Sequence, residues 1–268
     1  MKRIMERLEY KYLVPEDALG PLRQQLLPFL VADSHVGQGG DYTIRSIYFD
    51  TAALDYYYQK ESGIQYRRKL RVRGYGQQSE NALAFLEIKR KDNAVISKSR
   101  TSFDFRDGEA LFASGDIARY IRHADTDPRA VKDAQSFFYH LYRYSLLPTI
   151  LVCYEREAYF GRYNSSLRLT LDKTLRSAPF PRLDELYDEK QQRRSLEGHF
   201  ILELKFNGGT PGWLKTLLEK YQLERQALSK YTISLDQHRI PQRATAFSAW
   251  SLAQLPGSRK QTAALAVS

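Results

Sequence analysis

The sequence predicts an α+β protein in which an eight-stranded antiparallel β-barrel encloses a tunnel and helices pack against its outside. Three observations predict this fold. Segments with strand periodicity carry charged residues on one face and apolar residues on the other. Most of those charged residues are arginine or lysine, and segments of helical periodicity lie between the strands. A closed barrel turns such charged faces inward around a solvated lumen and its apolar faces outward against the helices.

The composition is that of a globular protein with an excess of positive charge. Its 268 residues contain 41 Lys and Arg against 31 Asp and Glu, and 43% are hydrophobic, which is enough for a sizeable core. The net charge of +10 indicates a polyanionic partner: nucleic acid, an anionic membrane or a phosphorylated small molecule. The single cysteine, Cys153, excludes an intramolecular disulfide and a cysteine-based zinc site. With no signal peptide and no run of about 18 apolar residues, we expect a soluble protein of the cytoplasm, a reducing compartment.

The first half of the chain has the pattern of a strand meander with one early helix. Alternation over residues 5–14 predicts a strand with Arg7, Glu9 and Lys11 on one face. Pro15 and two acidic residues then begin a helix with a leucine stripe, predicted over residues 15–30. Further strands of this half are predicted over residues 42–50, 65–75, 83–91 and 94–103, with a helical turn between the first two.

The second half begins with helices and then returns to strands. Apolar residues recur at helical spacing between about 108 and 146, which predicts a helical insert rather than a separate domain. Strands are predicted over residues 149–154, 158–163, 166–174 and 200–206, and helices within 211–238. We therefore expect residues 1–240 to form one domain, and the polar, Ala- and Ser-rich residues 241–268 to form a flexible tail.

The segment Gln65–Tyr75 concentrates positive charge on one strand face. Alternation places Arg67, Lys69, Arg71 and Arg73 on the same side. Neighbouring cations repel each other, so this face needs water or a bound anion beside it. For a single strand, a solvated face with nothing bound is an equal alternative. Other segments repeat the pattern, and this repetition favours a bound anion.

A few carboxylates accompany the cations on the charged faces. They are Glu9, Glu87, Asp172 and Glu203. Hard oxygen ligands beside phosphate groups select Mg²⁺ or Mn²⁺. We expect Glu87 to pair with an inward arginine, whereas Asp172 fits either a structural role or a site role. None of the five histidines belongs to a recognisable catalytic constellation.

Six short motifs, in this order along the chain, resemble those of the triphosphate tunnel metalloenzymes. The resemblance is greatest to the branch that contains the VTC (vacuolar transporter chaperone) polyphosphate polymerase domain. Each motif is weak alone, but the ordered set is specific and runs from the first strand to the last helix. The motifs are R-x-E-x-K-Y at Arg7–Tyr12, S-x-Y-F-D-T at Ser46–Thr51, L-R-V-R-x-Y at Leu70–Tyr75, E-I-K-R-K at Glu87–Lys91, L-E-L-K-F at Leu202–Phe206 and L-S-K-Y at Leu228–Tyr231.

The resemblance implies a tunnel that binds ATP, triphosphate or polyphosphate together with Mn²⁺ or Mg²⁺. It implies Glu203 as the main metal ligand, and Glu9 is a second candidate ligand. Arg67 and Lys69 lie outside the motif and are assigned to an entrance or to the surface. The implied catalytic cations are Lys11, Arg71, Arg73, Lys89, Lys98, Arg156, Arg168 and Lys230. Substrate-binding roles are assigned to Ser229, as a phosphate hydrogen-bond donor, and to Arg7, Arg100 and Lys205.

The predicted function is a metal-dependent polyphosphate polymerase that transfers the γ-phosphate of ATP to a growing polyphosphate chain. Hydrolytic members of the resembled family open with E-x-E-x-K, whereas Arg7 replaces the first acid here, which favours the polymerase branch. An anionic chain end needs no strong general base. Two alternatives stay open: a tripolyphosphatase or nucleoside triphosphatase of the same fold, and a non-catalytic binder of polyphosphate or RNA. No P-loop or RNA-binding motif is present, so we expect no specific nucleic-acid partner.

Overall fold

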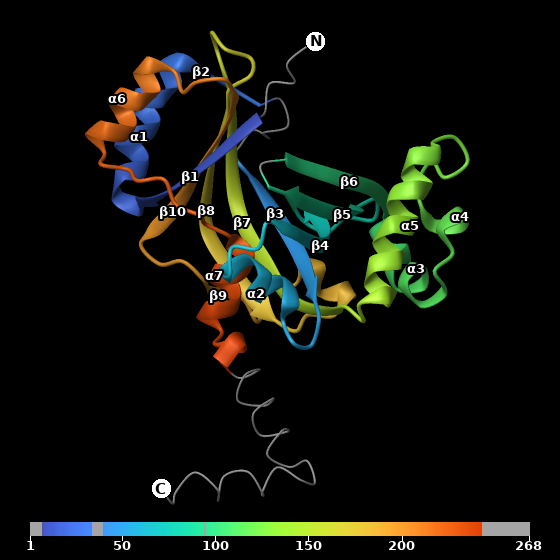
Figure 1. Cartoon of the computed structure of the whole chain (residues 1–268). Helices are drawn as coiled ribbons and strands as arrows, with labels where there is room; N and C mark the ends of the chain where they lie inside the picture. The colour runs from blue at the N-terminus through green and yellow to red at the C-terminus, as the bar shows by residue number, and fades with distance from the viewer. Residues whose placement is uncertain (1–6, 34–39, 94, 243–268) are drawn as a thin grey trace, which may run out of the picture.

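The computed structural model describes residues 7–33, 40–93 and 95–242 (Figure 1). Within these residues the predicted strands form a single antiparallel sheet. Its strands are β1 (Arg7–Pro15), β2 (Leu30–Ala32), β3 (Tyr42–Asp50), β4 (Tyr66–Tyr75), β5 (Leu83–Asp92), β6 (Val95–Asp104), β7 (Leu147–Gly161), β8 (Arg168–Pro179), β9 (Arg193–Arg194) and β10 (His199–Asn207). The helices are α1 (Leu19–Leu26), α2 (Asp55–Glu61), α3 (Gly108–Ser114), α4 (Ile117–Tyr120), α5 (Pro128–Arg143), α6 (Gly212–Lys220) and α7 (Lys230–Gln237).

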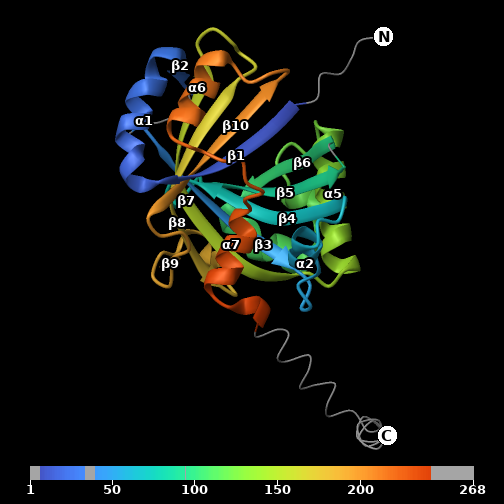
Figure 2. The same ribbon diagram turned by 60° about the vertical axis from the view of Figure 1, so that its left-hand side comes forward.

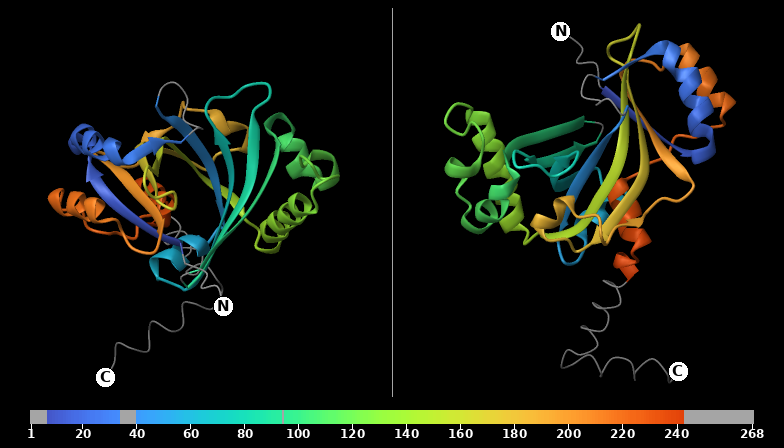
Figure 3. Two further views of the ribbon diagram at one scale, coloured as in Figure 1. Left: turned by 90° about the horizontal axis from the view of Figure 1, so that it is seen from above. Right: turned by 180° about the vertical axis from the view of Figure 1, so that it is seen from behind.

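The sheet is an open, curled half-barrel (Figure 3, left). Its main path is β1-β10-β8-β7-β3-β4-β5-β6, with β2 added to β7 and β9 to β8. In the described residues β1 and β6, the two ends of this path, are not paired with each other, so the expected closed barrel is not seen.

Loop segments pair with part of both outer edges of the described sheet. On β1, Tyr12 forms a bridge with Arg225, and the Gln226 N–H donates to the Lys11 carbonyl at 2.8 Å. On β6, Phe103 forms a bridge with Ile121. A backbone group already engaged by a loop is not available for pairing with a facing strand.

The two predicted segments of residues 149–154 and 158–163 form one continuous strand, β7. The pairing of β7 with β8 shifts register between Cys153 and Glu155, and such an irregularity bends a strand without ending it. The two short strands β2 and β9 were not predicted. They have three and two residues, too few for an alternation pattern to be visible in the sequence.

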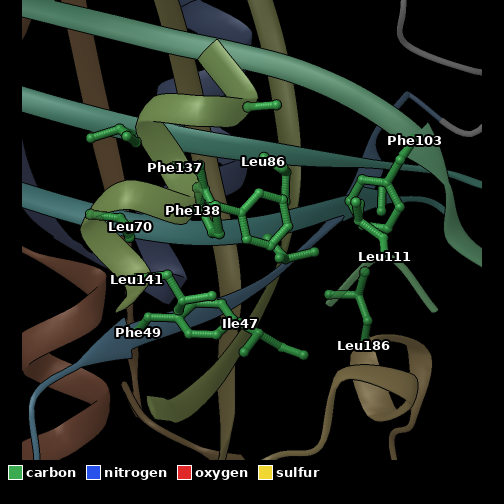
Figure 4. Close-up of a cluster of buried hydrophobic side chains, with 14 of the residues drawn as sticks. Ile47, Phe49, Leu70, Leu86, Phe103, Leu111, Phe137, Phe138, Leu141 and Leu186 are labelled. Atoms are coloured by element: carbon green, nitrogen blue, oxygen red, sulfur yellow. The ribbon is translucent and has the colours of Figure 1, made fainter. Parts of the chain in front are cut away.

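Helices α3, α4 and α5 cover the convex face of the β3–β6 side. Phe137 and Phe138 of α5 pack against Leu86 of β5 and Leu70 of β4, all buried (Figure 4). Each fully buried side chain of this kind contributes about 1.5–3 kcal/mol relative to exposure. The helical insert between the two β-rich halves thus shields the apolar face of one half of the sheet.

Helices α1 and α6 cover the convex face of the other half of the sheet (Figure 2). Leu22 of α1 and Leu214 of α6 are buried in the same core as Leu202 of β10. The rings of Phe29 and Trp213 stack with their centroids 4.3 Å apart, which connects the ends of these two helical segments. Helices on both outer flanks leave the charged strand faces on the concave side. None of the helices in the described ranges is long and apolar enough to cross a membrane.

Helix α7 lies on the concave side at one end of the sheet. Tyr231 and Leu235 of α7 are buried against Tyr48 of β3 and Val152 of β7, which lie on the same face of the sheet as the charged residues. This third core fills one end of the concave face with apolar side chains. The charged residues therefore occupy the rest of that face.

Asp50, a fully buried carboxylate at the end of β3, joins α2 and α7 to the sheet. It accepts hydrogen bonds from the backbone N–H groups of Tyr56, at 2.9 Å, and Tyr57, at 3.0 Å, and from the Tyr231 hydroxyl. Burial raises the pKa of Asp50, while these hydrogen bonds act in the opposite direction. The aspartate of the S-x-Y-F-D-T motif thus positions α7.

The substitution Tyr231→Phe should lower the free energy of unfolding by about 1.5–3 kcal/mol, because it removes a hydroxyl donor from a buried carboxylate. Urea denaturation at neutral pH measures this change. Tyr163→Phe is the matched control, since the Tyr163 side chain is 84% exposed and its substitution should cost less than about 0.5 kcal/mol. Equal costs for the two substitutions would contradict the role assigned to the Asp50–Tyr231 hydrogen bond.

Candidate functional site

A cluster of charged side chains covers the concave face between the ends of the sheet. Strand alternation places all but one of its members there, opposite the apolar residues that pack under the outer helices, and α7 contributes the remaining one. We call these residues the charged cluster. Its cations are Lys11, Lys69, Arg71, Arg73, Lys89, Lys98, Arg100, Arg156, Lys205 and Lys230, and its carboxylates are Glu9, Glu87, Asp172 and Glu203.

Glu87 of β5 is the centre of one part of the cluster. Its side chain is 1% exposed and accepts from Arg71 Nε at 2.8 Å and Lys98 Nζ at 2.6 Å. Arg100 Nε lies 3.3 Å and Arg73 Nε 3.9 Å from the same carboxylate. Burial opposes ionisation, but Arg71, Arg73 and Lys98 prevail and hold the pKa of Glu87 well below its ordinary range. The expected pairing of Glu87 with inward cations is therefore observed.

Glu9 of β1 connects the two ends of the sheet. Its carboxylate lies 3.0 Å from Lys11 Nζ, 3.7 Å from Lys205 Nζ and 3.2 Å from Lys89 Nζ of β5. The last contact spans the open side of the half-barrel. Burial and the nearby Glu203 carboxylate raise the pKa of Glu9, but the three ammonium groups outweigh them and lower it to about 2.

Asp172 of β8 connects the sheet to α7. It accepts from Arg156 Nε at 2.6 Å and lies 2.5 Å from Nζ of Lys230, the first residue of α7. Burial opposes its ionisation, yet Arg156 and Lys230 lower the pKa of Asp172 below its ordinary value. Asp172 thus has a structural role within the candidate site, since it holds two of the predicted phosphate-binding cations.

Lys69 also belongs to the charged cluster, which corrects its assignment to an entrance or to the surface. Its Nζ donates to Ser229 Oγ at 2.6 Å and lies 5.3 Å from the centroid of the Tyr231 ring. The alternation of β4 already placed Lys69 on the face of Arg71, but the motif L-R-V-R-x-Y begins one residue later and excluded it. Arg67, by contrast, donates to the Lys60 carbonyl outside the cluster at 3.3 Å.

The structure brings most of the predicted site residues together, with two exceptions. Arg168 lies opposite Lys205 in the β8–β10 register, but its guanidinium pairs with Asp33 at 3.0 Å rather than with a carboxylate of the cluster. Arg7 begins β1, and its side chain lies outside what the structure describes. The predicted residues brought into the cluster are Lys11, Arg71, Arg73, Lys89, Lys98, Arg100, Arg156, Lys205, Ser229, Lys230, Glu9 and Glu203.

Glu9 and Glu203, the two carboxylates assigned to a metal by the resemblance, could together hold a divalent cation. They lie on adjacent strands, and Lys205 Nζ contacts both of them, so one cation already bridges the pair. Over the described ranges, no group of three or more His, Cys, Asp and Glu side chains is placed to hold a metal. Two carboxylates nevertheless suit Mg²⁺ or Mn²⁺, because such ions take their remaining ligands from substrate phosphates and water.

Two surface hollows lie away from the charged cluster. One, of about 370 Å³, is lined by residues of α6 and the following turn together with Tyr12. The other, of about 900 Å³, is lined by residues 78–81, the segment around Phe105, and Leu183. Neither is lined by a residue of the cluster, whose side chains bridge one another across the concave face.

The carboxylates of the cluster should make the stability of the folded protein depend on pH in the acidic range. Their pKa values are lowered in the folded protein, so they stabilise it above pH 4.5 and lose that contribution as the pH falls toward about 2. Glu87→Gln should cost about 3 kcal/mol at pH 7, because it leaves buried cations without their counter-charge. Urea denaturation between pH 7 and pH 3 should show the two stability curves converging as pH falls. Curves that stay parallel, as expected for exposed Glu80→Gln, would contradict this coupling.

Comparisons with known proteins identify the family of the chain. A model of the VTC domain matches residues 6–238. No curated protein matches the chain. Among solved structures, the PH1819 protein from Pyrococcus horikoshii OT3 is 13% identical over 86% of this chain and 99% of its own, with a TM-score of 0.44. The Schizosaccharomyces pombe Mediator head module is 8% identical over 91% and 95%, with a TM-score of 0.36.

At these identities and TM-scores, neither solved structure bears on the activity of the chain. The family match, in contrast, covers the sheet and all four carboxylates of the charged cluster. The chain therefore belongs to the VTC domain family.

Proposed function

We propose that the chain is a metal-dependent polyphosphate polymerase that transfers the γ-phosphate of ATP to a growing polyphosphate chain on the concave face. One observation carries the proposal. Among the described residues, ten cations from six strands and α7 converge on this face, and four carboxylates accompany them. The membership in the VTC domain family supports the same substrate class. We assign the activity to one domain, residues 1–240.

An extended polyanion suits the charged cluster better than a compact one. Its cations belong to separate groups around Glu87, Glu9 and Asp172, on strands from both ends of the sheet. A chain of phosphates carries charge at each unit and can meet these groups in succession. Arginines such as Arg71 and Arg156 present planar forks that match two phosphate oxygens, while lysines act as point charges.

Glu203 and Glu9 would hold the divalent cation, Mn²⁺ or Mg²⁺. When bound, it neutralises charge on the transferring phosphoryl group. Lys205, which contacts both carboxylates, would then be released to bind a phosphate oxygen. Each of the other carboxylate-paired cations of the cluster would likewise exchange its carboxylate partner for a phosphate oxygen when the polyanion binds.

The reaction requires alignment and charge neutralisation rather than a strong base. A terminal oxygen of the polyphosphate chain attacks the γ-phosphorus, and the bond from that phosphorus to the β–γ bridging oxygen breaks. ADP leaves with the electron pair of the broken bond, and the chain becomes one phosphate longer. The attacking oxygen is already anionic, so no proton has to be removed from it.

The state of the carboxylates favours chain extension over hydrolysis. An attacking water must lose a proton, and a base with a strongly lowered pKa accepts a proton poorly. Glu9, Glu87, Asp172 and Glu203 all have lowered pKa values and are engaged by cations. The tripolyphosphatase or nucleoside triphosphatase and the non-catalytic binder of polyphosphate or RNA are the alternatives that the experiment separates.

The test is product analysis after incubation of the purified chain with ATP and either Mn²⁺ or Mg²⁺. Long phosphate chains that form in step with ADP are the expected result. Free phosphate without chain growth, even with a polyphosphate primer, would identify a hydrolase. Binding of tripolyphosphate or RNA without turnover of ATP would identify a non-catalytic binder. Either of these last two outcomes overturns the proposal.

Glu203→Gln should separate turnover from anion binding. Loss of a metal ligand should reduce metal-dependent turnover by at least about 100-fold. Binding of tripolyphosphate in EDTA, measured by calorimetry, should be unchanged or tighter, because the substitution removes a negative charge from the cluster. Glu219→Gln, an exposed substitution on α6, serves as the control and should change neither quantity. Equal losses of binding and turnover would contradict the metal-ligand role.

Affinity for tripolyphosphate should fall as the pH rises through about 8. Burial lowers the pKa of Lys98 to about 8, although Glu87 opposes this shift, so Lys98 loses its charge above that pH. An anion binds the charged form, so the affinity lost should approach about tenfold per pH unit above the pKa. Titrations of the wild type and of Lys98→Arg, which keeps its charge, should diverge above pH 8. Identical pH profiles for the two proteins would contradict this role of Lys98.

A further inference from the structure

Lys69 differs from every other cation of the charged cluster in its partners. Nine of the ten lie within 4.0 Å of a carboxylate of the cluster. Lys69 has no such contact in the described residues, and its Nζ donates instead to Ser229 Oγ at 2.6 Å. A positive charge on this amine thus lacks the compensation that the rest of the cluster has.

The groups that face the Lys69 amine do not compensate such a charge. Lys11 of β1, Lys89 of β5, Lys60 of α2 and Arg67 of β4 all interact with it as like charges. From α7 it meets the ring of Tyr231 and the hydroxyl of Ser229.

The carboxylate of Asp50 on the neighbouring strand β3 is committed elsewhere. Its two oxygens already accept hydrogen bonds from the Tyr231 hydroxyl and from the backbone N–H groups of Thr51, Tyr56 and Tyr57. Burial, as the main cause, and repulsion from the charges of Lys11 and Lys89, as the next, hold the pKa of Lys69 well below its ordinary value.

Ser229 completes a small anion-binding arrangement beside Lys69. It is the N-cap of α7, where its Oγ accepts from the Thr232 N–H at 3.4 Å and from Lys69. The hydroxyl hydrogen of Ser229 is then left to donate to a further acceptor. The N-terminus of α7 adds positive potential at the same place, and Lys230 directly follows. A phosphate oxygen is the acceptor that this combination fits.

We infer that Lys69 completes the phosphate subsite at Ser229, and that the Lys69 amine takes up one proton from solvent when a phosphate of the chain occupies this subsite. The inference rests on the proposed function, because it assumes that a polyphosphate binds the concave face. The bound phosphate supplies the negative charge that the surroundings of Lys69 lack. The proton adds to the amine nitrogen, and no other bond changes.

Calorimetry of the full chain with inorganic tripolyphosphate tests the inference. Titrations at pH 7.5 in two buffers with different ionisation enthalpies give the number of protons taken up on binding. Wild type should take up more protons than Lys69→Arg, by as much as about one. Lys69→Arg is permanently charged, so it should bind at least as tightly as wild type. Lys60→Arg, a neighbouring lysine that pairs with Glu61 at 2.9 Å, is the matched control and should take up as many protons as wild type.

Each outcome is decisive. Equal proton uptake by wild type and Lys69→Arg would overturn the inference while leaving the proposed function intact. Lys69→Met should take up fewer protons and bind about tenfold more weakly or worse, since it loses a charge-assisted hydrogen bond to phosphate. If Lys69→Met binds tripolyphosphate as tightly as wild type, Lys69 is not part of the subsite. Failure of the wild type to bind tripolyphosphate at all would overturn the proposed function together with the inference.

Discussion

The pairing of buried carboxylates with inward cations is the interaction on which the concave face depends. Two unit charges 4 Å apart interact by about 4 kcal/mol at an effective dielectric constant of 20, so uncompensated cations on adjacent strands would repel strongly. Glu87 alone contacts four cations from two strands, and Glu9 contacts one from the far side of the sheet. These carboxylates allow the sheet to curl with its charged face inward.

Helix α7 turns this charged sheet into a site with a defined end. Asp50, buried beneath it, holds Tyr231 in place, and Tyr231 lies two residues after Ser229. The S-x-Y-F-D-T motif thus acts through packing and hydrogen bonding, whereas the L-S-K-Y motif brings Ser229 and Lys230 to the charged cluster. The two motifs are far apart in sequence and form one structural unit.

Strand alternation was enough to predict which side chains face inward, because a two-residue period assigns each residue to a face. Arg71, Arg73 and Glu203 are all on the concave face for this reason. Closure of the barrel could not be predicted in this way, since it depends on pairing between the edges of β1 and β6, and the alternation of side chains does not report which edges pair. Arg168 pairs with Asp33, which is far away in sequence, so this contact could not be predicted from a local sequence pattern. Lys69 precedes the motif L-R-V-R-x-Y, so the motif does not report its role, whereas the alternation of β4 places it on the face of Arg71.

The pairing of carboxylates with cations on the concave face also affects how tightly a long polyanion would bind there and how readily it would be released. A cation without a partner would bind phosphate tightly and release it slowly. Each cation that is paired with a carboxylate would exchange it for a phosphate oxygen on binding. The binding free energy gained at each such cation is therefore only the difference between two ion pairs. In the proposed polymerase a growing chain would have to advance after each transfer, and very tight binding of every unit would lower the ground state without helping the reaction. The cluster thus combines a high density of positive charge with a small net binding free energy for each phosphate contact. Lys69 is the exception, and the proton that it takes up makes binding at its end of the face respond to pH.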